Sequence, residues 1–559
     1  MHRHRWVCVV VTGWRENFRC GRPCFWSFLL RLRPYWPARI GITREWHRCI
    51  APPWNLLSIA ARAVQVKGGN DVEGTNSVED TNPVEGTNSV GPNALVSIIM
   101  PVYNQWAYTK ECLAAIHRYT PENHEVIVVN NGSTDETLVS LQNLPMVKRL
   151  DNDHNEGFPK ACNQGMAMAR GDTLVILNND VVVSHNWLKN LLHCLYADDR
   201  HGAVGPVTNW VSGGQCRAQP YDTLERFHSF AEQYNHTDST RWDYALRLVG
   251  FCLVLRKSVY EQVGGFDEQF GRGNFEDDDY CLRVRRAGYK LVVAGDTYVH
   301  HHGSITNRAD VGFAQLLQGN QARFVHKWGV NPWYSVFTRE DLADLVPPVK
   351  RVLDVGCACG GLGLTLKNRG VAEVAGIELD PAAAVDARTV LDDVWVGDAS
   401  SLSLPRPPGW YEALVFADVL EHMVDPLAAL VHLLTYLKPG GVVVASIPNV
   451  GHISVLQGLL NGTWTYQSAG VLDRTHLRFF TLVEMQRLLN EAGLTLEFVG
   501  MVQDVTPEQE QFLTFLSTAV ESQHLDSQGP SLPDRCRTVQ YYLRARKAFA
   551  AVKGEVPVG

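Results

Sequence analysis

Short apolar runs of strand length alternate with helical stretches in two separate parts of the chain. The first series starts at Leu95 with LVSIIMPVYN and continues through EVIVVNNGSTD and TLVILNNDVVV, and the second starts at Arg351 with RVLDVG. Such alternation predicts a mostly parallel sheet with helices on both faces. Because 559 residues are also too many for one hydrophobic core, we expect two α/β domains.

Three other segments lack the features of a folded core. Residues 1–70 are rich in Arg and Trp with poor apolar periodicity, and residues 71–94 repeat a polar unit rich in Gly and Asn. Residues 331–349 contain three prolines. We therefore predict a poorly ordered leader at 1–70, a linker at 71–94, a first domain at 95–330, an inter-domain linker at 331–349 and a second domain at 350–550.

Composition limits the partners and the compartment. The formal net charge of −8 gives no sign of a nucleic-acid-binding surface, and no apolar run approaches the roughly 18 residues that a membrane span needs. The Arg- and Trp-rich leader could lie on an anionic membrane surface, or it could be unstructured. The thirteen cysteines are scattered, mostly in apolar stretches, as reduced core thiols are. We expect a cytoplasmic protein, with peripheral association at the inner face of the membrane as an alternative.

Polar side chains follow two strands of the first series. In a parallel sheet, ligands bind beyond the carboxyl ends of the strands. The strand Glu125–Val129 runs into a turn with Asn130 and Asp135, whose side chains could bind a nucleobase and a ribose. The strand Thr173–Leu177 runs into Asp180. A carboxylate in this place suits Mg²⁺ or Mn²⁺, which prefer oxygen ligands and share phosphate oxygens.

Two further groups of ionisable residues occur later in the first series. Glu276–Asp279 stand at the start of a predicted helix, where capping and the helix dipole alone also favour acids. His300–His302 follow a strand, and one of the three could bind a metal ion while the others are merely polar neighbours. The residue types by themselves leave both interpretations open.

Seven motifs between residues 95 and 310 occur in order, namely LVSIIMPVYN, VVNNGSTDET, NEGFPKACNQGMAMARGD, LNNDVVV, GGFDEQF, EDDDYCLRVRRAGY and HHHGS. This series resembles the family-2 inverting glycosyltransferases of the GT-A nucleotide-diphospho-sugar transferase fold, most of all the rhamnosyltransferase-type members that build surface polysaccharide. The resemblance implies that Asp277 is the general base and that Asp180 and His301 form the metal and diphosphate site. It implies a nucleotide-sugar site comprising Pro101, Tyr103, Asn130, Asp135 and Asn178.

The second series places acids at the ends of successive strands. RVLDVGCACGG joins a strand to a helix through a Gly-rich turn, which lets the backbone approach a ligand closely. Glu378 ends the next strand, where it could bind ribose hydroxyls, and Asp398 ends a third. A nicotinamide-dependent dehydrogenase is the competing interpretation, but this loop lacks the GxGxxG spacing.

From residue 350 to about 500 the chain resembles class I S-adenosylmethionine-dependent methyltransferases, on the motifs VLDVGC, GIELDP, VGDAS, DVLEHMVDP, LKPGGVVVASIPN and LDRTHLRFFT. The resemblance implies a Rossmann-like fold and S-adenosylmethionine as cofactor. Its cofactor site would comprise Asp354, Gly356 and Gly360 at the methionine part, Glu378 at the ribose and Asp398 at the adenine.

The acceptor side of this second domain is less defined. His422 and His476 are candidates for the base that accepts a hydroxyl proton, although either could be an ordinary, partly buried histidine. Ala358 replaces the usual middle glycine of the loop, and its methyl group would narrow the cofactor pocket.

Together these features predict a bifunctional enzyme of surface polysaccharide synthesis. It would transfer a sugar from a nucleotide-diphospho-sugar to a glycan or lipid-linked oligosaccharide with inversion, using a divalent metal, and methylate a sugar hydroxyl using S-adenosylmethionine. The alternative is a glycan-binding or scaffold protein in which one or both sites are inactive. Three departures from the family patterns allow that alternative, namely Asn130, Asn178 and Ala358.

Overall fold

The computed structural model describes residues 9–10, 94–303, 312–521 and 530–549. The chain divides into two compact units with the boundary between Val336 and Phe337; residues 94–336 are here called the first unit and residues 337–549 the second unit. The leader and repeat linker predicted at 1–94 lie outside the described residues, apart from 9–10 and 94. The predicted linker 331–349 contains two short helices, α10 (Pro332–Ser335) and α11 (Glu340–Ala343).

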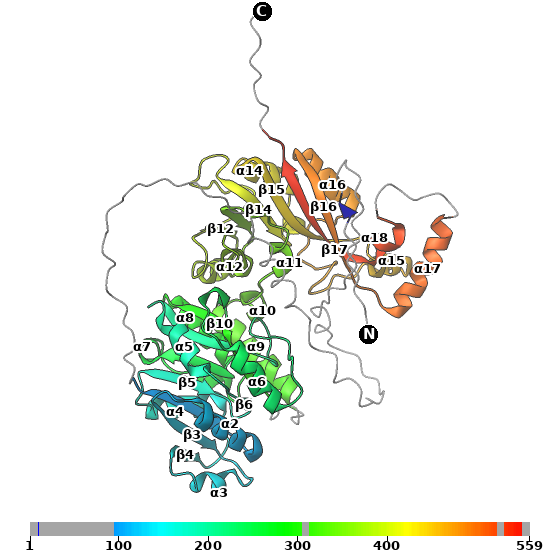
Figure 1. Ribbon diagram of the computed structural model, residues 1–559. Helices are drawn as coiled ribbons and strands as arrows, with labels where there is room; N and C mark the ends of the chain where they lie inside the picture. The colour runs from blue at the N-terminus through cyan, green and yellow to red at the C-terminus, as the bar shows by residue number, and fades with distance from the viewer. Residues whose placement is uncertain (1–8, 11–93, 304–311, 522–529, 550–559) are drawn as a thin grey trace, which may run out of the picture. The chain divides into compact units, whose positions relative to one another are not determined.

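The first unit is built on one large sheet, whose strand order is β4-β3-β2-β5-β9-β7-β10-β6, with β8 also paired to β10. Its strands are coloured from blue to green in Figure 1. They are β2 (Val96–Val102), β3 (His124–Asn131), β4 (Val147–Asn152), β5 (Thr173–Leu177), β6 (Val181–Val182), β7 (His201–Thr208), β8 (Trp242–Ala245), β9 (Cys252–Arg256) and β10 (Lys290–His301).

The prediction of a mostly parallel sheet is wrong for three strands of this unit, β6, β8 and β9. Strands β2 to β5 run parallel, but β9 is antiparallel to both β5 and β7. Strands β6 and β8 are likewise antiparallel to β10. The partners of β9 are remote in sequence, so its direction is a tertiary property that the local apolar pattern does not encode.

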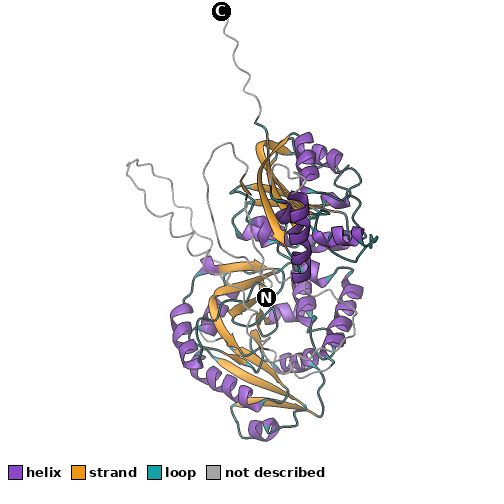
Figure 2. Cartoon of the chain, turned by 90° about the vertical axis from the view of Figure 1, so that its right-hand side faces the viewer, coloured by secondary structure: helices purple, strands orange, loops and turns teal. Residues whose placement is uncertain are grey.

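Helices lie on both sides of this sheet (Figure 2). Helix α4 packs on β2 and β3, whereas α5 packs on β7 and β10. The helices of this unit are α2 (Trp106–Tyr119), α3 (Thr137–Gln142), α4 (Phe158–Met168), α5 (Trp187–Tyr196), α6 (Leu224–Tyr234), α7 (Lys257–Val263), α8 (Glu276–Arg286), α9 (Phe313–Trp328) and α10.

The second unit has a sheet of order β1-β16-β17-β15-β14-β11-β12-β13, with β11 flanked by β14 and β12. Strands β11 to β15 are parallel, and β16 and β17 are antiparallel additions. The strands are β1 (Val9–Val10), β11 (Arg351–Val355), β12 (Glu373–Glu378), β13 (Asp393–Val396), β14 (Tyr411–Ala417), β15 (Leu437–Pro448), β16 (Leu494–Gln503) and β17 (Thr538–Lys547).

Helices cover this second sheet as the alternating pattern predicts. Helix α12 packs on β12, α14 on β15 and α16 on β16. None of the helices within the described ranges is long and apolar enough to cross a bilayer. Besides α11, the helices are α12 (Gly361–Asn368), α13 (Pro381–Ala387), α14 (Pro426–Leu434), α15 (Ile453–Leu460), α16 (Leu482–Glu491), α17 (Pro507–Glu521) and α18 (Leu532–Arg537).

Candidate active sites in the two units

Asp180 and His301 meet in the first unit because β6 and the end of β10 are paired, with His301 opposite Val181. The two side chains are nearly buried, and His301 Nε2 lies 3.2 Å from Asp180 Oδ1. His301 Nδ1 lies 2.7 Å from the carbonyl oxygen of Trp210. Since a carbonyl only accepts hydrogen bonds, Nδ1 carries a hydrogen and Nε2 faces the carboxylate. A lone pair and a carboxylate at this distance repel each other unless a proton or a cation is also there.

The other two histidines of the triplet have different partners. His300 Nδ1 lies 2.9 Å from the hydroxyl of Tyr221, and burial lowers the pKa of His300 to about 4, an effect that the neighbouring His302 adds to. His302 Nε2 lies 2.7 Å from Glu111 Oε2. Of the three, His301 is therefore the one whose ring nitrogen faces Asp180.

Asp277 is buried at the start of α8, with both carboxylate oxygens oriented by backbone N–H groups. Its Oδ2 accepts from Gly250 at 3.0 Å and its Oδ1 from Asp278 at 3.0 Å. The residue after Gly250 is Phe251, whose ring stacks on the ring of His301 with centroids 5.3 Å apart. The short segment 250–251 thus joins Asp277 to the pair formed by His301 and Asp180.

The remaining acids of the run have structural partners or are deeply buried. Asp279 has no exposed surface and accepts hydrogen bonds from Arg283 and Trp328 at 2.9 and 3.0 Å. Asp278 forms an ion pair with Arg247 at 2.9 Å. Burial, with the neighbouring Asp277 adding to it, raises the pKa of Glu276 well above its ordinary value. Ion pairing and burial therefore account for Asp278 and Asp279, whereas no side-chain hydrogen bond caps this helix.

The turn that precedes α8 was not anticipated from the sequence. Gly273, Asn274 and Phe275 have φ angles of 114°, 74° and 73°, a left-handed run that is unfavourable for a bulky residue such as Phe. Asn320 of α9 lies against this turn, fully buried. Its Nδ2 donates to the carbonyl oxygens of Phe270, Gly273 and Asn274 at 2.8, 2.8 and 3.1 Å.

The predicted nucleotide-binding residues at the end of β3 make hydrogen bonds within the turn and to the neighbouring β4 and α2. Asn130, 2% exposed, donates to Asp151 Oδ1 at 3.0 Å and accepts from the Ser133 N–H at 3.2 Å. Asp135 accepts from the N–H groups of Thr137 and Trp106 at 3.0 and 3.4 Å. These side chains shape the turn, and a contact of either with a nucleotide stays a prediction.

The other three predicted residues of this nucleotide-sugar site lie at the ends of β2 and β5. Pro101 is buried in β2, and Tyr103 follows that strand, partly exposed. Asn178 follows β5, and its buried Oδ1 has no hydrogen-bond partner among the described residues. An unpaired buried amide oxygen costs free energy unless a ligand or water donates to it. Asn178 is thus available to a ligand in a way that Asn130 is not.

In the second unit, the Gly-rich loop between β11 and α12 needs its glycines for two reasons. Gly356 and Gly360 have φ angles of 71° and 86°. A Cβ at Gly356 would lie 2.5 Å from a methyl carbon of Val419, and one at Gly360 would lie 2.6 Å from Val390. Ala358, which stands where glycine is usual in this loop, also adopts a positive φ angle, 46°, so its backbone is strained.

Glu378 faces this loop, as predicted. Its Oε2 accepts a hydrogen bond from the Ala358 N–H at 2.7 Å, and its Oε1 accepts from the Asp380 N–H at 2.9 Å. Asp354, 1% exposed, has no hydrogen-bond partner for either carboxylate oxygen within the described ranges. Burial, and then the charge of Glu378, raises the pKa of Asp354 to about 7. Asp398 is exposed and accepts from the Ser400 N–H at 2.9 Å.

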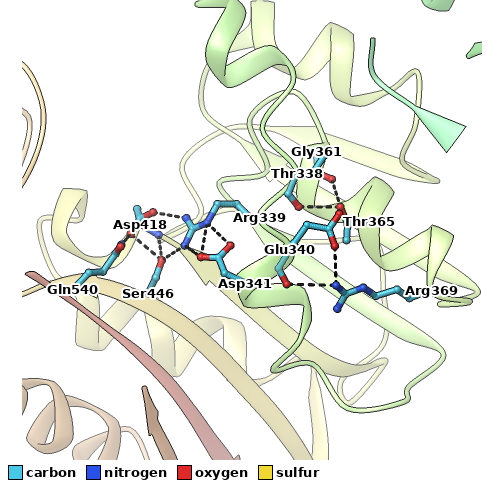
Figure 3. Close-up of polar contacts among 10 residues, drawn as sticks. All are labelled: Thr338, Arg339, Glu340, Asp341, Gly361, Thr365, Arg369, Asp418, Ser446 and Gln540. Atoms are coloured by element: carbon cyan, nitrogen blue, oxygen red, sulfur yellow. Dashed lines mark hydrogen bonds and ion pairs between the residues drawn. The ribbon is translucent and has the colours of Figure 1, made fainter. Parts of the chain in front are cut away.

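A buried guanidinium that sequence reasoning missed lies beside these acids. Arg339, 7% exposed, comes from the segment expected to be a linker. It forms ion pairs with Asp418 and Asp341, and its Nη2 donates to Ser446 Oγ at 3.1 Å (Figure 3). Gln540 of β17 also donates to Asp418. Arg339 therefore ties α11 to the ends of β14, β15 and β17.

His422 and His476, predicted as alternative bases, lie together with a third ionisable residue. Their ring centroids are 4.9 Å apart. Glu421 is 1% exposed, and both of its carboxylate oxygens lack a hydrogen-bond partner among the described residues. Burial, and then the charge of Asp418, raises the pKa of Glu421 well above its ordinary value. The motif LEH placed Glu421 beside His422 in the sequence, but only the fold adds His476.

The two sheets, their acidic strand ends and the Gly-rich loop define a GT-A-type unit and a Rossmann-like unit in one chain. The chain carries a Glycosyl transferase family 2 domain, matched by residues 97–264, and a methyltransferase domain, matched by residues 332–498. The fold class and the two family resemblances predicted from the sequence are thereby confirmed.

Several proteins resemble parts of the chain. It is 31% identical over 231 residues to the O-antigen biosynthesis protein RfbC of Myxococcus xanthus, a match covering 38% of this chain and only 18% of RfbC. It is 26% identical over 234 residues to N-acetylglucosaminyl-diphospho-decaprenol L-rhamnosyltransferase of Mycobacterium tuberculosis, covering 37% of this chain and 76% of the relative. A SAM-dependent methyltransferase from Archaeoglobus fulgidus aligns at 16% identity and a TM-score of 0.28, over 40% of this chain and 99% of that one.

Proposed function

We propose that the first unit transfers a sugar from a nucleotide-diphospho-sugar to a glycan or lipid-linked oligosaccharide acceptor, with inversion at the anomeric carbon. The observation that carries this proposal is the approach of His301 Nε2 to Asp180 Oδ1, at 3.2 Å, where strand ends converge. The names of the relatives, an O-antigen biosynthesis protein and a rhamnosyltransferase, support surface polysaccharide as the product. A cytoplasmic location, with peripheral association at the inner membrane face, is part of this proposal.

Asp180 and His301 fit a divalent ion. The carbonyl of Trp210 holds the Nδ1 hydrogen of His301, so the Nε2 lone pair and the Asp180 carboxylate face the same point, where a cation would relieve their repulsion. Mg²⁺ or Mn²⁺ at this point would offset the negative charge of the departing nucleoside diphosphate.

Asp277 supplies the base in this proposal. Hydrogen bonds from the N–H groups of Gly250 and Asp278 fix its carboxylate. The acceptor hydroxyl passes its proton to Asp277 while its oxygen attacks the anomeric carbon and the bond to the diphosphate breaks. One displacement inverts the anomeric centre.

We propose that the second unit uses S-adenosylmethionine to methylate a sugar hydroxyl. The Gly356–Gly360 loop, with positive φ angles at both glycines, would let the backbone approach the cofactor closely. Glu378, which accepts a hydrogen bond from the Ala358 N–H, would bind the ribose hydroxyls. The unpaired carboxylate of Asp354 fits a cofactor that carries a positive charge. S-adenosylmethionine would supply an electrophilic methyl group on its sulfonium, while Asp398 stays the residue proposed for the adenine.

Mass spectrometry of a glycan acceptor incubated with a panel of nucleotide sugars, with and without S-adenosylmethionine, tests both halves. Asp277→Asn and Asp180→Ala should each abolish the sugar addition, whereas Asp222→Asn, which alters an exposed ion pair with Arg226, should not. Binding of the nucleotide sugar without any transfer would contradict the proposal and favour the glycan-binding alternative.

The methyl-donor half has a separate readout. Saturation at about 100 times the dissociation constant should stabilise the second unit by about 2.7 kcal/mol. Glu378→Ala should remove that shift, while Glu484→Ala, an exposed glutamate paired with Arg487 on α16, should keep it. A wild-type chain whose melting temperature is unchanged by S-adenosylmethionine would contradict this half alone.

A further inference from the structure

Glu421, His422 and His476, here called the Glu421 cluster, are arranged as a ligand set. Each residue offers one ligand atom, and the three atoms all lie within 4.8 Å of one another. Within the described ranges no other group of three His, Cys, Asp or Glu residues meets this geometry. Glu421 and His422 come from the turn after β14, and His476 comes from the loop before α16.

Backbone carbonyls orient both imidazoles for metal binding. His422 Nδ1 lies 3.1 Å from the carbonyl oxygen of Thr475, and His476 Nδ1 lies 3.0 Å from that of Val471. Each Nδ1 must therefore carry the hydrogen, which leaves the Nε2 lone pair free to bind an ion. Metal-binding histidines in proteins almost always donate their second ring N–H in this way.

The carboxylate of Glu421 has no partner of its own among the described residues. It is almost fully buried, and neither oxygen has a hydrogen-bond partner in the described part of the chain. A buried, unpaired carboxylate is costly unless a cation accompanies it. The nearby guanidinium of Arg339 pairs with Asp341 and Asp418, and neither oxygen of Glu421 accepts a hydrogen bond from it.

We propose that the Glu421 cluster binds a divalent first-row transition-metal ion in the methyltransferase unit. Two imidazoles and one carboxylate suit ions such as Zn²⁺, Mn²⁺ or Fe²⁺, and three protein ligands leave coordination positions open. His422 is exposed whereas Glu421 and His476 are buried, so the cluster reaches the surface, where an acceptor can approach an ion. The histidines are ligands in this arrangement and not free bases.

The cluster lies next to the proposed cofactor loop. Val419, two residues before Glu421, packs so closely on Gly356 that a Cβ there would come within 2.5 Å of it. Parallel pairing of β14 with β11 sets Phe416 opposite Val355, the residue before Gly356. An acceptor held at the cluster would thus stand beside the loop proposed to hold the methyl donor.

This inference rests on the proposed methyl transfer and specifies how the acceptor is held. An ion at the cluster would bind the acceptor hydroxyl as a Lewis acid and lower the pKa of that hydroxyl. The hydroxyl proton then leaves to solvent water, the oxygen forms a bond to the methyl carbon, and the carbon–sulfur bond breaks to release S-adenosylhomocysteine. No oxidant or reductant is needed.

Titration of the full-length, metal-free chain with Co²⁺, followed by visible absorption and equilibrium dialysis, tests the site. Relative to the wild-type chain, His422→Asn and Glu421→Gln should each lose one equivalent of bound Co²⁺, or bind it more than about 10-fold more weakly. His432→Asn is the matched control, because His432 is a partly buried histidine of the same unit whose Nε2 contacts the carbonyl of Leu402. It should bind as much Co²⁺ as the wild-type chain.

The amount of Co²⁺ bound by each variant is compared with the amount bound by the wild-type chain, so an ion bound at Asp180 contributes equally to both and does not affect the result. Because His422 is exposed, its replacement should not disturb folding, which retention of the thermal shift by S-adenosylmethionine would verify. Equal Co²⁺ binding by the wild-type, His422→Asn and Glu421→Gln chains would overturn the inference. Loss of Co²⁺ in these variants, with no response of the wild-type chain to S-adenosylmethionine, would uphold the metal site and refute the proposed methyl transfer.

Discussion

Replacing Asn320 with Ala should destabilise the first unit far more than an ordinary substitution on a helix. Asn320 is fully buried on α9, and its amide group donates to three backbone carbonyls of the turn before α8. That turn holds Gly273, Asn274 and Phe275 at positive φ angles. Its conformation is unfavourable by itself and depends on these hydrogen bonds.

The structure sets the size of the effect. The carbonyl of Phe270 keeps a second donor, the Gly273 N–H at 3.2 Å, so the carbonyls of Gly273 and Asn274 are the ones left unpaired. The contact to the Gly273 carbonyl is buried and that to the Asn274 carbonyl is part-buried, so at roughly 1–3 kcal/mol for a buried, unpaired carbonyl the expected loss is about 3 kcal/mol. For a domain of this size, the melting temperature should fall by about 6–12 °C.

Differential scanning calorimetry of the full chain measures this loss, and the transition that S-adenosylmethionine does not shift belongs to the first unit. Gln318→Ala is the control, because Gln318 is exposed on the same helix. Sugar transfer by Asn320→Ala should also fall, since the turn positions Asp277. If Asn320→Ala and Gln318→Ala melted at the same temperature, the stabilising role assigned to Asn320 would be wrong.

Three further predictions concern single side chains. Arg339→Met should cost roughly 2 kcal/mol, because Asp341 loses its ion pair while the partly exposed Asp418 keeps hydrogen bonds from Ser446 and Gln540. Arg369→Met, whose ion-pair partners are exposed, should cost under ~1 kcal/mol in urea unfolding. Gly360→Ala should weaken S-adenosylmethionine binding in calorimetric titration, because the new Cβ would add a clash with Val390 to the strain of a positive φ angle. Gly370 also has a positive φ angle, but a Cβ there meets no atom within 4 Å, so Gly370→Ala should not weaken binding. Burial lowers the pKa of His201, so the free energy of unfolding should decline as pH falls below about 6.5. His201→Phe should make this decline smaller, and a variant with the same pH dependence of stability as the wild-type chain would contradict the prediction.

The sequence went far in predicting the fold, because periodicity and strand ends are local properties. The strand predicted at Thr173–Leu177 matches the structure residue for residue. Acids at strand ends predicted that Glu378 lies at the Gly-rich loop, and the resemblance to family-2 glycosyltransferases implied that Asp180 and His301 share one site. Sheets of this type bring their strand ends to one rim, so these encounters follow from the pattern.

Features that depend on distant pairs were not predictable in this way. Arg339 sits in a proline-containing stretch with no apolar period, and it becomes important only because Asp418, 79 positions later, lies beside it. In the sequence, Asn320 is one of several polar residues of a helix. Its role depends on a hydrogen bond to the turn 50 positions earlier, which only the folded chain brings against it. The antiparallel direction of β9 also arises from pairing with strands remote in sequence.

The amino-acid sequence by itself determined that this chain forms two α/β units with acidic strand ends, because strand and helix periods and turn residues act over a few positions. Only the tertiary structure decided which polar groups stay unpaired and what they face. Glu421 and His422 are adjacent in the sequence, but His476 joins them through folding. A ligand set is defined by distances of a few ångströms between side chains, and such distances exist only once the chain has packed.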